Sequence, residues 1–339
     1  MKKIKPLIEL SKKGLYCERG DFYIDPWLPV KKAILTHAHA DHTYRGNQDY
    51  LVPEEGKHLS RVRLGDEAKI STCKYGEVQT INGVKLSFHP AGHVLGSAQV
   101  RVEYKGEIWV ASGDYKLTPD ATCAPFEHIR CHNFITEATF GLPIYRWTPT
   151  GQIFSQINDW WRHNQERGKV SVLFAYALGK SQRILSGIDR GIGKIFTHGA
   201  VERLNNAYRE SGVDLPETTY VGGVENKKEF ANSLVIATPS CAGSNWLKRF
   251  GAHSTGFASG WMVVRGARRR KAVDRGFVLS DHADWTELQT AIRETEAETV
   301  FVTHGFIPEL VRWLNENDIN AKPLKTTYVG EEDIIEETE

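Results

Sequence analysis

The first part of the chain carries short apolar runs separated by turn residues. This pattern predicts β-strands joined by tight turns, including a hairpin in which Ala98–Tyr104 and Glu107–Ala111 flank Lys105-Gly106. Another apolar run, Ala33-Ile34-Leu35, leads directly into a segment rich in histidine. We therefore expect buried strands whose ends carry polar residues.

The pattern changes near Pro143–Thr150, after which helical spacing of apolar residues appears. Apolar runs then alternate with helix-like segments, which predicts an α/β fold with a parallel sheet and helices on its faces. The alternating segments are Gly151–Glu166, Val170–Leu178, Ser181–Arg190, Lys194–Thr197, Val201–Glu210 and Asn232–Thr238. After about residue 270 the chain returns with an expected strand at Phe277–Leu279, a helix at Trp285–Glu296, a strand at Thr299–Thr303 and a helix at Pro308–Asn315.

The chain of 339 residues is long enough for one large core or two modest domains. No apolar run approaches the roughly 20 residues of a membrane span. The basic start, Met1–Pro6, has no apolar stretch behind it, so no secretory signal is expected. Five cysteines without a CxxC pair predict reduced thiols. We therefore expect a cytoplasmic protein without a membrane partner.

The formal net charge of +1 hides an uneven distribution. Residues 331–339 contain six acids and no base, so the rest of the chain carries +7. Six basic residues lie between Arg265 and Arg275, and such a cluster suits nucleic-acid phosphates. A solvated basic loop is the alternative. The candidate phosphate contacts in this cluster are Arg268, Arg269 and Arg270.

The segment Thr36–His42 places three imidazoles and a carboxylate within a few positions. In an extended segment, residues i and i+2 point to the same side, so His37 and His39 can reach one metal together. Asp41 and His42 follow on a turn and face a second metal. Imidazole with carboxylate suits Zn²⁺, with Mn²⁺ or Fe as alternatives. A solvated histidine-rich loop is the non-functional alternative.

Two coordination shells need further ligands, and three other segments end in suitable residues. His93 lies in a glycine-flanked turn after a strand, Asp114 ends an apolar strand, and His304 ends another. Side chains at the ends of buried strands are held rigidly, as a dinuclear site requires. Each residue alone is more often a cap or a turn residue. Together, following the histidine-rich segment, they predict a two-metal site.

With these segments in this order, the chain resembles the metallo-β-lactamase fold and, within it, the β-CASP branch of nucleic-acid nucleases. The resemblance covers nearly the whole chain and implies an αββα sandwich with an inserted β-CASP α/β domain. Asp25 matches the family's first motif, an acid that braces the histidine-rich loop through hydrogen bonds. The implied ligands are His37, His39 and His93 for the first metal, Asp41, His42 and His304 for the second, and Asp114 as the bridge.

Three residues match the motifs of this branch. Glu137 matches the acidic motif A, His282 in Val278–Asp284 matches motif B, and His304 matches motif C. Motifs A and B, with the large insert, disfavour a small-molecule hydrolase such as a lactamase or thioesterase. DNA nucleases of the Artemis type usually have an aliphatic residue at motif C, whereas RNA-processing members have histidine. The motifs alone therefore leave the nucleic acid open.

A narrower likeness favours DNA. Five segments look like those of the bacterial DNA-ligase-associated exonucleases: Pro6–Leu10, Gly14–Cys17, Gly20–Trp27, Leu178–Arg183 and Phe257–Met262. This likeness implies a DNA exonuclease of DNA repair, with 5′→3′ polarity, associated with a DNA ligase and a helicase. An RNA-processing ribonuclease of the same branch is the main alternative. A non-catalytic clamp is disfavoured because buried ligands without metal are costly.

The resemblance also divides the chain into domains. Residues 1–145 and 271–330 would form a discontinuous metallo-β-lactamase domain, residues 146–270 the β-CASP insert, and residues 331–339 an acidic tail.

In the expected reaction, two divalent ions, Zn²⁺ or alternatively Mn²⁺, activate a water and polarise the phosphate. His282 is the expected general acid for the leaving O3′, and Glu137 would orient its ring. Asp41 is grouped with these catalytic residues because it faces the metals. The product would carry a 5′-phosphate.

Turn residues in the insert are further candidates for phosphate contacts. Lys180 and Ser181 stand at an expected helix start, where backbone amides favour anions. Ser240, Gly243 and Ser244 lie in a small-residue turn after a strand. Ordinary turn chemistry is the alternative for both segments.

Overall fold

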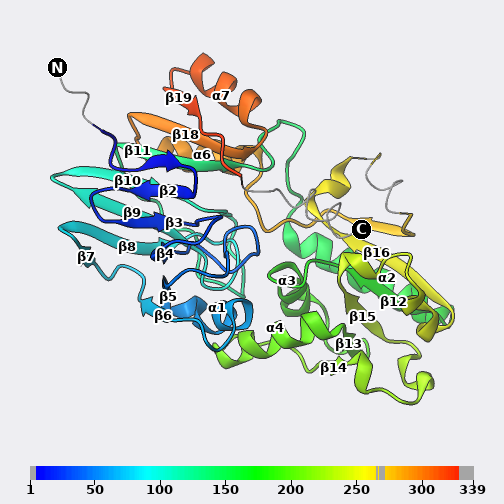
Figure 1. Ribbon diagram of the computed structural model, residues 1–339. Helices are drawn as coiled ribbons and strands as arrows, with labels where there is room; N and C mark the ends of the chain where they lie inside the picture. Colours follow the sequence, from blue (N-terminus) through cyan, green and yellow to red (C-terminus); the bar gives the residue numbers. More distant parts are fainter. Residues whose placement is uncertain (1–4, 265, 267–271, 328–339) are drawn as a thin grey trace. The chain divides into compact units, whose positions relative to one another are not determined.

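The computed structural model describes residues 5–264, 266 and 272–327, which fall into two compact units. One unit contains the described residues up to Pro143 together with those from His282 onward, and the other contains those within Ile144–Asp281. Figure 1 shows the ribbon coloured along the sequence. The first unit is therefore discontinuous in sequence, and the second is inserted into it.

The first unit contains a six-stranded sheet in the order β1-β2-β3-β4-β5-β6. Its strands pair antiparallel from β1 to β3 and parallel from β3 to β6. The elements are β1 (Glu9–Ser11), β2 (Gly14–Cys17), β3 (Phe22–Ile24), β4 (Lys32–Ile34), β5 (Asp49–Pro53), α1 (Lys57–Leu64) and β6 (Ile70–Cys73).

A second, seven-stranded sheet in the same unit has the order β19-β18-β11-β10-β9-β8-β7. Strands β9 and β10 pair antiparallel, which confirms the predicted hairpin. The elements are β7 (Gln79–Ile81), β8 (Val84–Pro90), β9 (Ala98–Tyr104), β10 (Glu107–Ala111), β11 (Asn133–Ala138), α6 (Trp285–Glu294), β18 (Thr299–Gly305), α7 (Ile307–Glu316) and β19 (Ala321–Pro323).

Alternating side chains explain how these two sheets pack face to face. Along β4, Ile34 enters a buried cluster shared with β8 and β9, whereas Ala33 faces the opposite side and packs with Leu64 of α1. Along β10, Trp109 enters the same shared cluster, and Val110 packs with apolar residues of α6 and α7. Helices thus cover the outer face of each sheet, and the predicted αββα sandwich is confirmed.

The second unit contains one six-stranded sheet in the order β14-β13-β15-β12-β16-β17, with every pair parallel. This confirms the parallel α/β sheet predicted from the alternating segments. Its elements are α2 (Thr150–Glu166), β12 (Val170–Phe174), α3 (Lys180–Gly187), β13 (Ile195–Thr197), α4 (Gly199–Glu210), β14 (Thr219–Tyr220), β15 (Leu234–Ala237), β16 (His253–Ala258) and β17 (Arg275–Phe277).

One predicted assignment is wrong. The sequence analysis placed a strand beginning at Phe277 in the returning part of the first domain, but β17 pairs with β16 in the sheet of the second unit. The described chain passes between the units at Asp281 and His282, not near residue 270. Strand β16 was not predicted, because Gly256 and two hydroxyl residues interrupt its apolar run.

Short 3₁₀ helices occur in both units, at Glu54–Gly56, Val221–Gly223, Lys227–Phe230, Pro239–Cys241, Asn245–Phe250 and Gly260–Val263. Across the described part of the chain, every helix is too short or too polar to cross a membrane.

Candidate metal centre

The histidine-rich loop follows β4 and is held in place by Asp25, which follows β3. The Asp25 carboxylate accepts hydrogen bonds from the Thr36 backbone N–H at 2.8 Å and the Thr36 hydroxyl at 2.6 Å. It also lies 2.7 Å from Nδ1 of His42. Asp25 is 2% exposed, so these bonds form away from solvent. The bracing role that the resemblance implied for Asp25 is thus compatible with its contacts.

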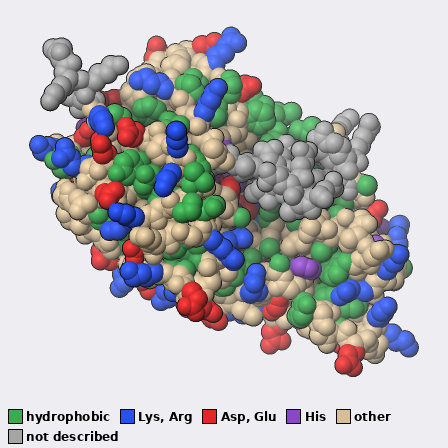
Figure 2. Space-filling view, viewed as in Figure 1, with side chains coloured by type: hydrophobic (Ala, Val, Ile, Leu, Met, Phe, Trp, Pro, Cys, Tyr) green, Lys and Arg blue, Asp and Glu red, His purple; other side chains and the backbone are tan. Residues whose placement is uncertain are grey.

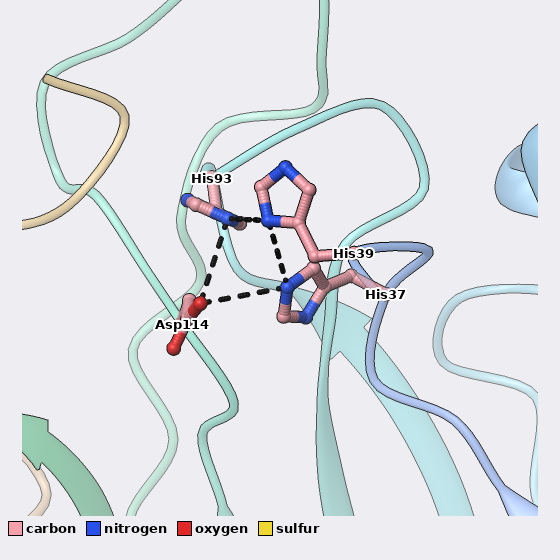
Figure 3. Close-up of side chains that lie close together, drawn as sticks. All are labelled: His37, His39, His93 and Asp114. Atoms are coloured by element: carbon pink, nitrogen blue, oxygen red, sulfur yellow. Dashed lines mark hydrogen bonds and ion pairs between the residues drawn. The ribbon is translucent and has the colours of Figure 1, made fainter. Parts of the chain in front are cut away.

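Four side chains from three separate segments meet beside this loop (Figure 3). His39 Nδ1 lies 3.1 Å from His37 Nε2 and 3.0 Å from His93 Nε2. The Asp114 Oδ2 atom lies 3.5 Å from His37 Nε2 and 3.7 Å from His93 Nε2. His37, His93 and Asp114 are buried, whereas His39 is half-buried. We call these four residues the first ligand group.

A second ligand group shares Asp114 with the first and adds His42 and His304. The Asp114 Oδ1 atom lies 3.0 Å from His304 Nε2 and 3.6 Å from His42 Nε2. Asp41 stands at the edge of this group, with Oδ2 3.6 Å from His42 Nε2. The two carboxylate oxygens of Asp114 therefore serve different groups, which is the geometry expected of a bridging ligand.

The protonation of the two groups differs. Burial lowers the pKa of His37 well below its usual range, and the neighbouring His42 lowers it further, so this ring is neutral. Burial also opposes protonation of His42, but the carboxylates of Asp114, Asp41 and Asp25 outweigh it and raise the pKa of His42 to about 10. Although burial raises the pKa of Asp114, the His42, His282 and His304 rings hold that pKa well below its usual range.

The donor set fits divalent metal ions. Ring nitrogens of the first group lie within hydrogen-bond distance of one another. Two neutral imidazole nitrogens can share at most one proton, so nitrogen lone pairs meet in this group, and a metal ion can accept them. Bonds of about 2 Å to a tetrahedral Zn²⁺ place ligand atoms about 3.3 Å apart, close to the separations observed here. The opposite nitrogens are also occupied: Nδ1 of His37 lies 3.0 Å from the Thr36 hydroxyl, and Nδ1 of His304 lies 2.8 Å from the Thr303 hydroxyl. Such contacts orient imidazoles toward a metal.

A buried imidazole–carboxylate pair lies next to the ligand groups. His282 Nδ1 is 2.9 Å from Glu137 Oε2, and ligand atoms of both residues lie within 4.8 Å of Asp114. The ring centroids of His282 and His93 are 4.6 Å apart. Glu137 and His282 are 1% and 3% exposed, so the pair is shielded from bulk water.

Tyr115 connects this pair to the metal ligands and was not singled out by the sequence. Its backbone N–H donates to Glu137 Oε1 at 2.8 Å, and its backbone carbonyl accepts from the N–H of Ala283 at 2.6 Å. One residue next to Asp114 therefore holds both Glu137 and the segment after His282, through the two backbone groups of Tyr115. No residue-type signal could have revealed this, because the contacts come from the backbone.

The structure gives less support to the predicted phosphate contacts than to the predicted metal ligands. Lys180 and Ser181 are both 0% exposed, and the Ser181 hydroxyl donates to the Tyr176 carbonyl at 2.7 Å. Their predicted role as a phosphate cradle is therefore wrong, because neither side chain faces solvent. Arg268, Arg269 and Arg270 lie outside the described residues.

The small-residue turn remains a candidate for phosphate contact. Ser240 and Gly243 are exposed, whereas Ser244 is half-buried and its hydroxyl donates to the Cys241 carbonyl at 2.8 Å. On the face drawn in Figure 2, basic and acidic side chains of the described residues are interspersed. Phosphate contact by this turn stays a prediction.

Comparisons with known proteins bear on the family. No family model matches the chain. It is 29% identical over 317 residues to "Probable DNA ligase" of Opitutus terrae, an alignment that covers 91% of this chain and 30% of that protein. The RNase J-like protein of Methanocaldococcus jannaschii is 26% identical over 54% of this chain and 46% of its own length. Endoribonuclease YSH1 of Saccharomyces cerevisiae is 22% identical over 50% of this chain and 26% of its own length. The chain thus spans less than half of each of these relatives.

A solved structure shares the fold. A protein of unknown function from Enterococcus faecalis V583 matches with a TM-score of 0.59 at 12% identity, covering 86% of this chain and 78% of that one. This likeness supports the architecture alone. The αββα sandwich and the inserted parallel-sheet unit agree with the fold that the sequence resemblance implied, and these relatives are consistent with the β-CASP branch of the metallo-β-lactamase fold family.

Proposed function

We propose that this chain is a two-metal phosphodiesterase that acts on DNA, as an exonuclease of DNA repair that leaves 5′-phosphate ends. One observation carries the proposal: Asp114 lies in two adjoining ligand groups, beside the buried pair of His282 and Glu137. Two ligand groups that share a carboxylate would hold two divalent ions next to each other, as many enzymes of phosphodiester hydrolysis do.

The ions supply a nucleophilic water at neutral pH and polarise the phosphoryl oxygens when they are bound. Zn²⁺ is the ion we propose, with Mn²⁺ as the alternative, because imidazole and carboxylate suit both. The first ligand group would hold one ion, and His42, His304 and Asp41 would hold the other, with Asp114 between them.

His282 supplies the proton that the leaving O3′ needs, because an unprotonated alkoxide is a poor leaving group. Its Nδ1 faces Glu137, so Nε2 is the atom that would donate to the leaving oxygen. Glu137 holds the ring orientation and stabilises the imidazolium form, as a carboxylate does for a catalytic imidazole. Breaking the bond between phosphorus and O3′ gives the departing nucleotide a 3′-hydroxyl and leaves the phosphate on the 5′ oxygen of the downstream strand, which therefore ends in a 5′-phosphate.

DNA is the substrate that the overall likeness favours. The likeness to the DNA-ligase-associated exonucleases includes segments in both units, and the relative named as a probable DNA ligase aligns with 91% of this chain. An association with a DNA ligase, and through it a helicase, belongs to the same proposal.

An RNA substrate is the second candidate, and a specific observation favours it. His304 occupies motif C, where RNA-processing members of the branch have histidine. Two of the relatives carry names of RNA nucleases, the RNase J-like protein and the endoribonuclease YSH1.

A strand-cleavage assay tests the proposal. Matched single- and double-stranded DNA and RNA, labelled at the 5′ or the 3′ end, would be incubated with metal-free protein and added Zn²⁺, Mn²⁺ or none. We expect metal-dependent release of 5′-phosphorylated mononucleotides from DNA, starting at the 5′ end, and slower cleavage of RNA. Faster cleavage of RNA would replace the DNA proposal with the RNA alternative. No cleavage of either strand by protein shown to contain metal would contradict phosphodiesterase activity.

A further inference from the structure

A buried charge cluster in the second unit lies where the chain passes toward His282. Lys180 and Arg183 of α3 are 0% and 2% exposed, and Asp281 is 0% exposed. Lys180 Nζ lies 3.6 Å from Asp281 Oδ2, and Arg183 Nε lies 3.2 Å from Asp281 Oδ1. We call these three residues the α3–Asp281 cluster.

Arg183 binds the backbone of this segment as well as the carboxylate. One of its terminal nitrogens donates to the carbonyl of Ser280 at 3.1 Å. The planar guanidinium therefore holds residues 280 and 281 together, in a way that a lysine ammonium could not reproduce.

Helix α3 is itself fixed at its start. The side-chain oxygen of Gln182 accepts from the N–H of Gly179 at 2.8 Å, and its side-chain nitrogen donates to Asn205 of α4 at 2.8 Å. The cations of the cluster thus project from a rigid base, and Asp281 is tied to the helical layer of the second unit.

Stability alone is a weak reason for such a cluster. Removing two cations and a carboxylate from water costs several kcal/mol for each ion, and apolar residues of similar size often stabilise a fold equally well. A buried charge network does, however, restrict the chain to one conformation. Here the restricted segment is Ser280-Asp281, which precedes His282.

His282 is held closely on both sides. Asp281 is fixed by the α3–Asp281 cluster, and Ala283 donates its N–H to the Tyr115 carbonyl at 2.6 Å. Consecutive Cα atoms are 3.8 Å apart across a trans peptide, so a single residue between two anchors has no slack. A shift of the backbone at residue 281 or residue 283 therefore changes the backbone position of His282 between them.

We propose that Lys180, Arg183 and Asp281 are positioning residues for His282. This inference rests on the proposed function, in which His282 gives a proton to the leaving group. It assigns to the Leu178–Arg183 segment a part in catalysis, in place of the phosphate contact that the sequence suggested.

Arg183→Met is the informative variant, with Arg183→Lys as the conservative one. Rates on saturating substrate would be compared for a DNA oligonucleotide and for the p-nitrophenyl ester of thymidine 5′-monophosphate, whose leaving group needs no proton. A misplacement of about 1 Å costs on the order of 10²-fold, and we expect a loss of that order for Arg183→Met on the oligonucleotide. The loss should be small on the ester, and Arg183→Lys should recover part of the oligonucleotide rate.

Controls separate positioning from general damage. Metal content and the unfolding midpoint would be measured for each variant, and metal content should stay at the wild-type value. Arg190→Met removes an exposed arginine that pairs with Asp214 in the same unit, and it should leave both rates unchanged. If Arg183→Met does not fold, Lys180→Met serves in its place, because it leaves the pair of Arg183 and Asp281 intact.

A double-mutant cycle with His282→Ala decides the inference. If the cluster acts through His282, Arg183→Met should cost little further in the His282→Ala background. An equal loss in both backgrounds, or an equal loss on both substrates, would overturn the positioning role while the proposed function stands. If His282→Ala alone leaves the oligonucleotide rate unchanged, the general-acid assignment itself fails, and the positioning role fails with it.

Discussion

The two units bury their charged and titratable side chains in opposite ways. In the first unit, ring nitrogens of several histidines face one another around Asp114, so acceptors converge with too few protons between them. In the second unit, Lys180 and Arg183 surround Asp281, so opposite charges meet. Unlike charges can satisfy one another within the fold, whereas converging acceptors need a cation from outside.

This contrast assigns different tasks to the two units. The first unit would hold the ions and the proton donor, and the second would position a segment and contact the strand. Each of the following experiments tests the task assigned to one of the two units.

The largest effect is expected for Asp114→Ala, which removes the carboxylate shared by both ligand groups. Metal content, measured by elemental analysis after mild purification, should fall from about two equivalents to near zero. Cleavage should fall below detection, because no group then activates the water. Asp49→Ala, which removes an ion pair with Lys69 in the same unit, is the matched control and should keep both ions. An Asp114→Ala protein that retains two equivalents would refute the bridging assignment.

His282→Ala should separate chemistry from metal binding within the first unit. The variant should keep its metal and lose roughly 10²–10⁴ in rate on a DNA strand, the usual contribution of a general acid. On a substrate with an activated leaving group the loss should shrink, since that group leaves without a proton. A loss of the same size on both substrates would show that His282 acts in another way.

The two ligand groups should also differ in their response to pH. Because the pKa of His42 is raised to about 10 in the metal-free fold, its proton must leave before an ion can bind to this ring. Uptake of the second ion should therefore tighten with rising pH, by about tenfold per pH unit, and level off near pH 10. The pKa of His37 is lowered well below 6.5, so its proton does not compete for the first ion above that pH.

Metal titrations at several pH values would measure this difference. Two uptake steps should appear, and the weaker one should change with pH more steeply than the tighter one. Two steps with identical pH dependence would contradict the distinction between the ligand groups.

The smallest effect is expected for the basic cluster of the second unit. Replacing Arg268, Arg269 and Arg270 with Ala should weaken DNA binding at low salt and flatten the salt dependence of Kd. Each lost phosphate contact lowers the salt slope by about 0.9 on duplex DNA or about 0.7 on a single strand. Rates on saturating substrate should change little. Measurements of Kd at several salt concentrations check this, and an unchanged slope would show that these arginines do not hold the strand.

The local pattern of residue types along the chain was enough to predict many of the candidate ligands in the first unit. His37, His93, Asp114 and His304 each follow or end a short apolar segment; the strand before His37 belongs to the six-stranded sheet, and the other three strands belong to the seven-stranded sheet that packs against it. Their convergence could therefore be anticipated from order and residue type. Helical spacing and the alternation of strand-like and helix-like segments likewise predicted the parallel sheet, because both depend on residues only a few positions apart, whereas the sandwich was implied by the family resemblance.

The role of Lys180 could not be anticipated in this way. At the start of a helix, next to Gly179, a lysine has the same local pattern whether it meets a phosphate or a buried acid. Its burial is decided by Asp281, which lies about a hundred residues further along the chain and reaches α3 only in the folded unit.

The sequence by itself therefore determined the candidate ligand set, the resemblance to the β-CASP branch and the alternation of strands and helices, since each depends on residue types at short spacing. The tertiary structure alone decided two further features: that Tyr115 connects Glu137 to the segment after His282, and that Asp281 is fixed by α3. These features depend on backbone groups and on partners distant in the chain. Only folding brings such groups within hydrogen-bonding distance.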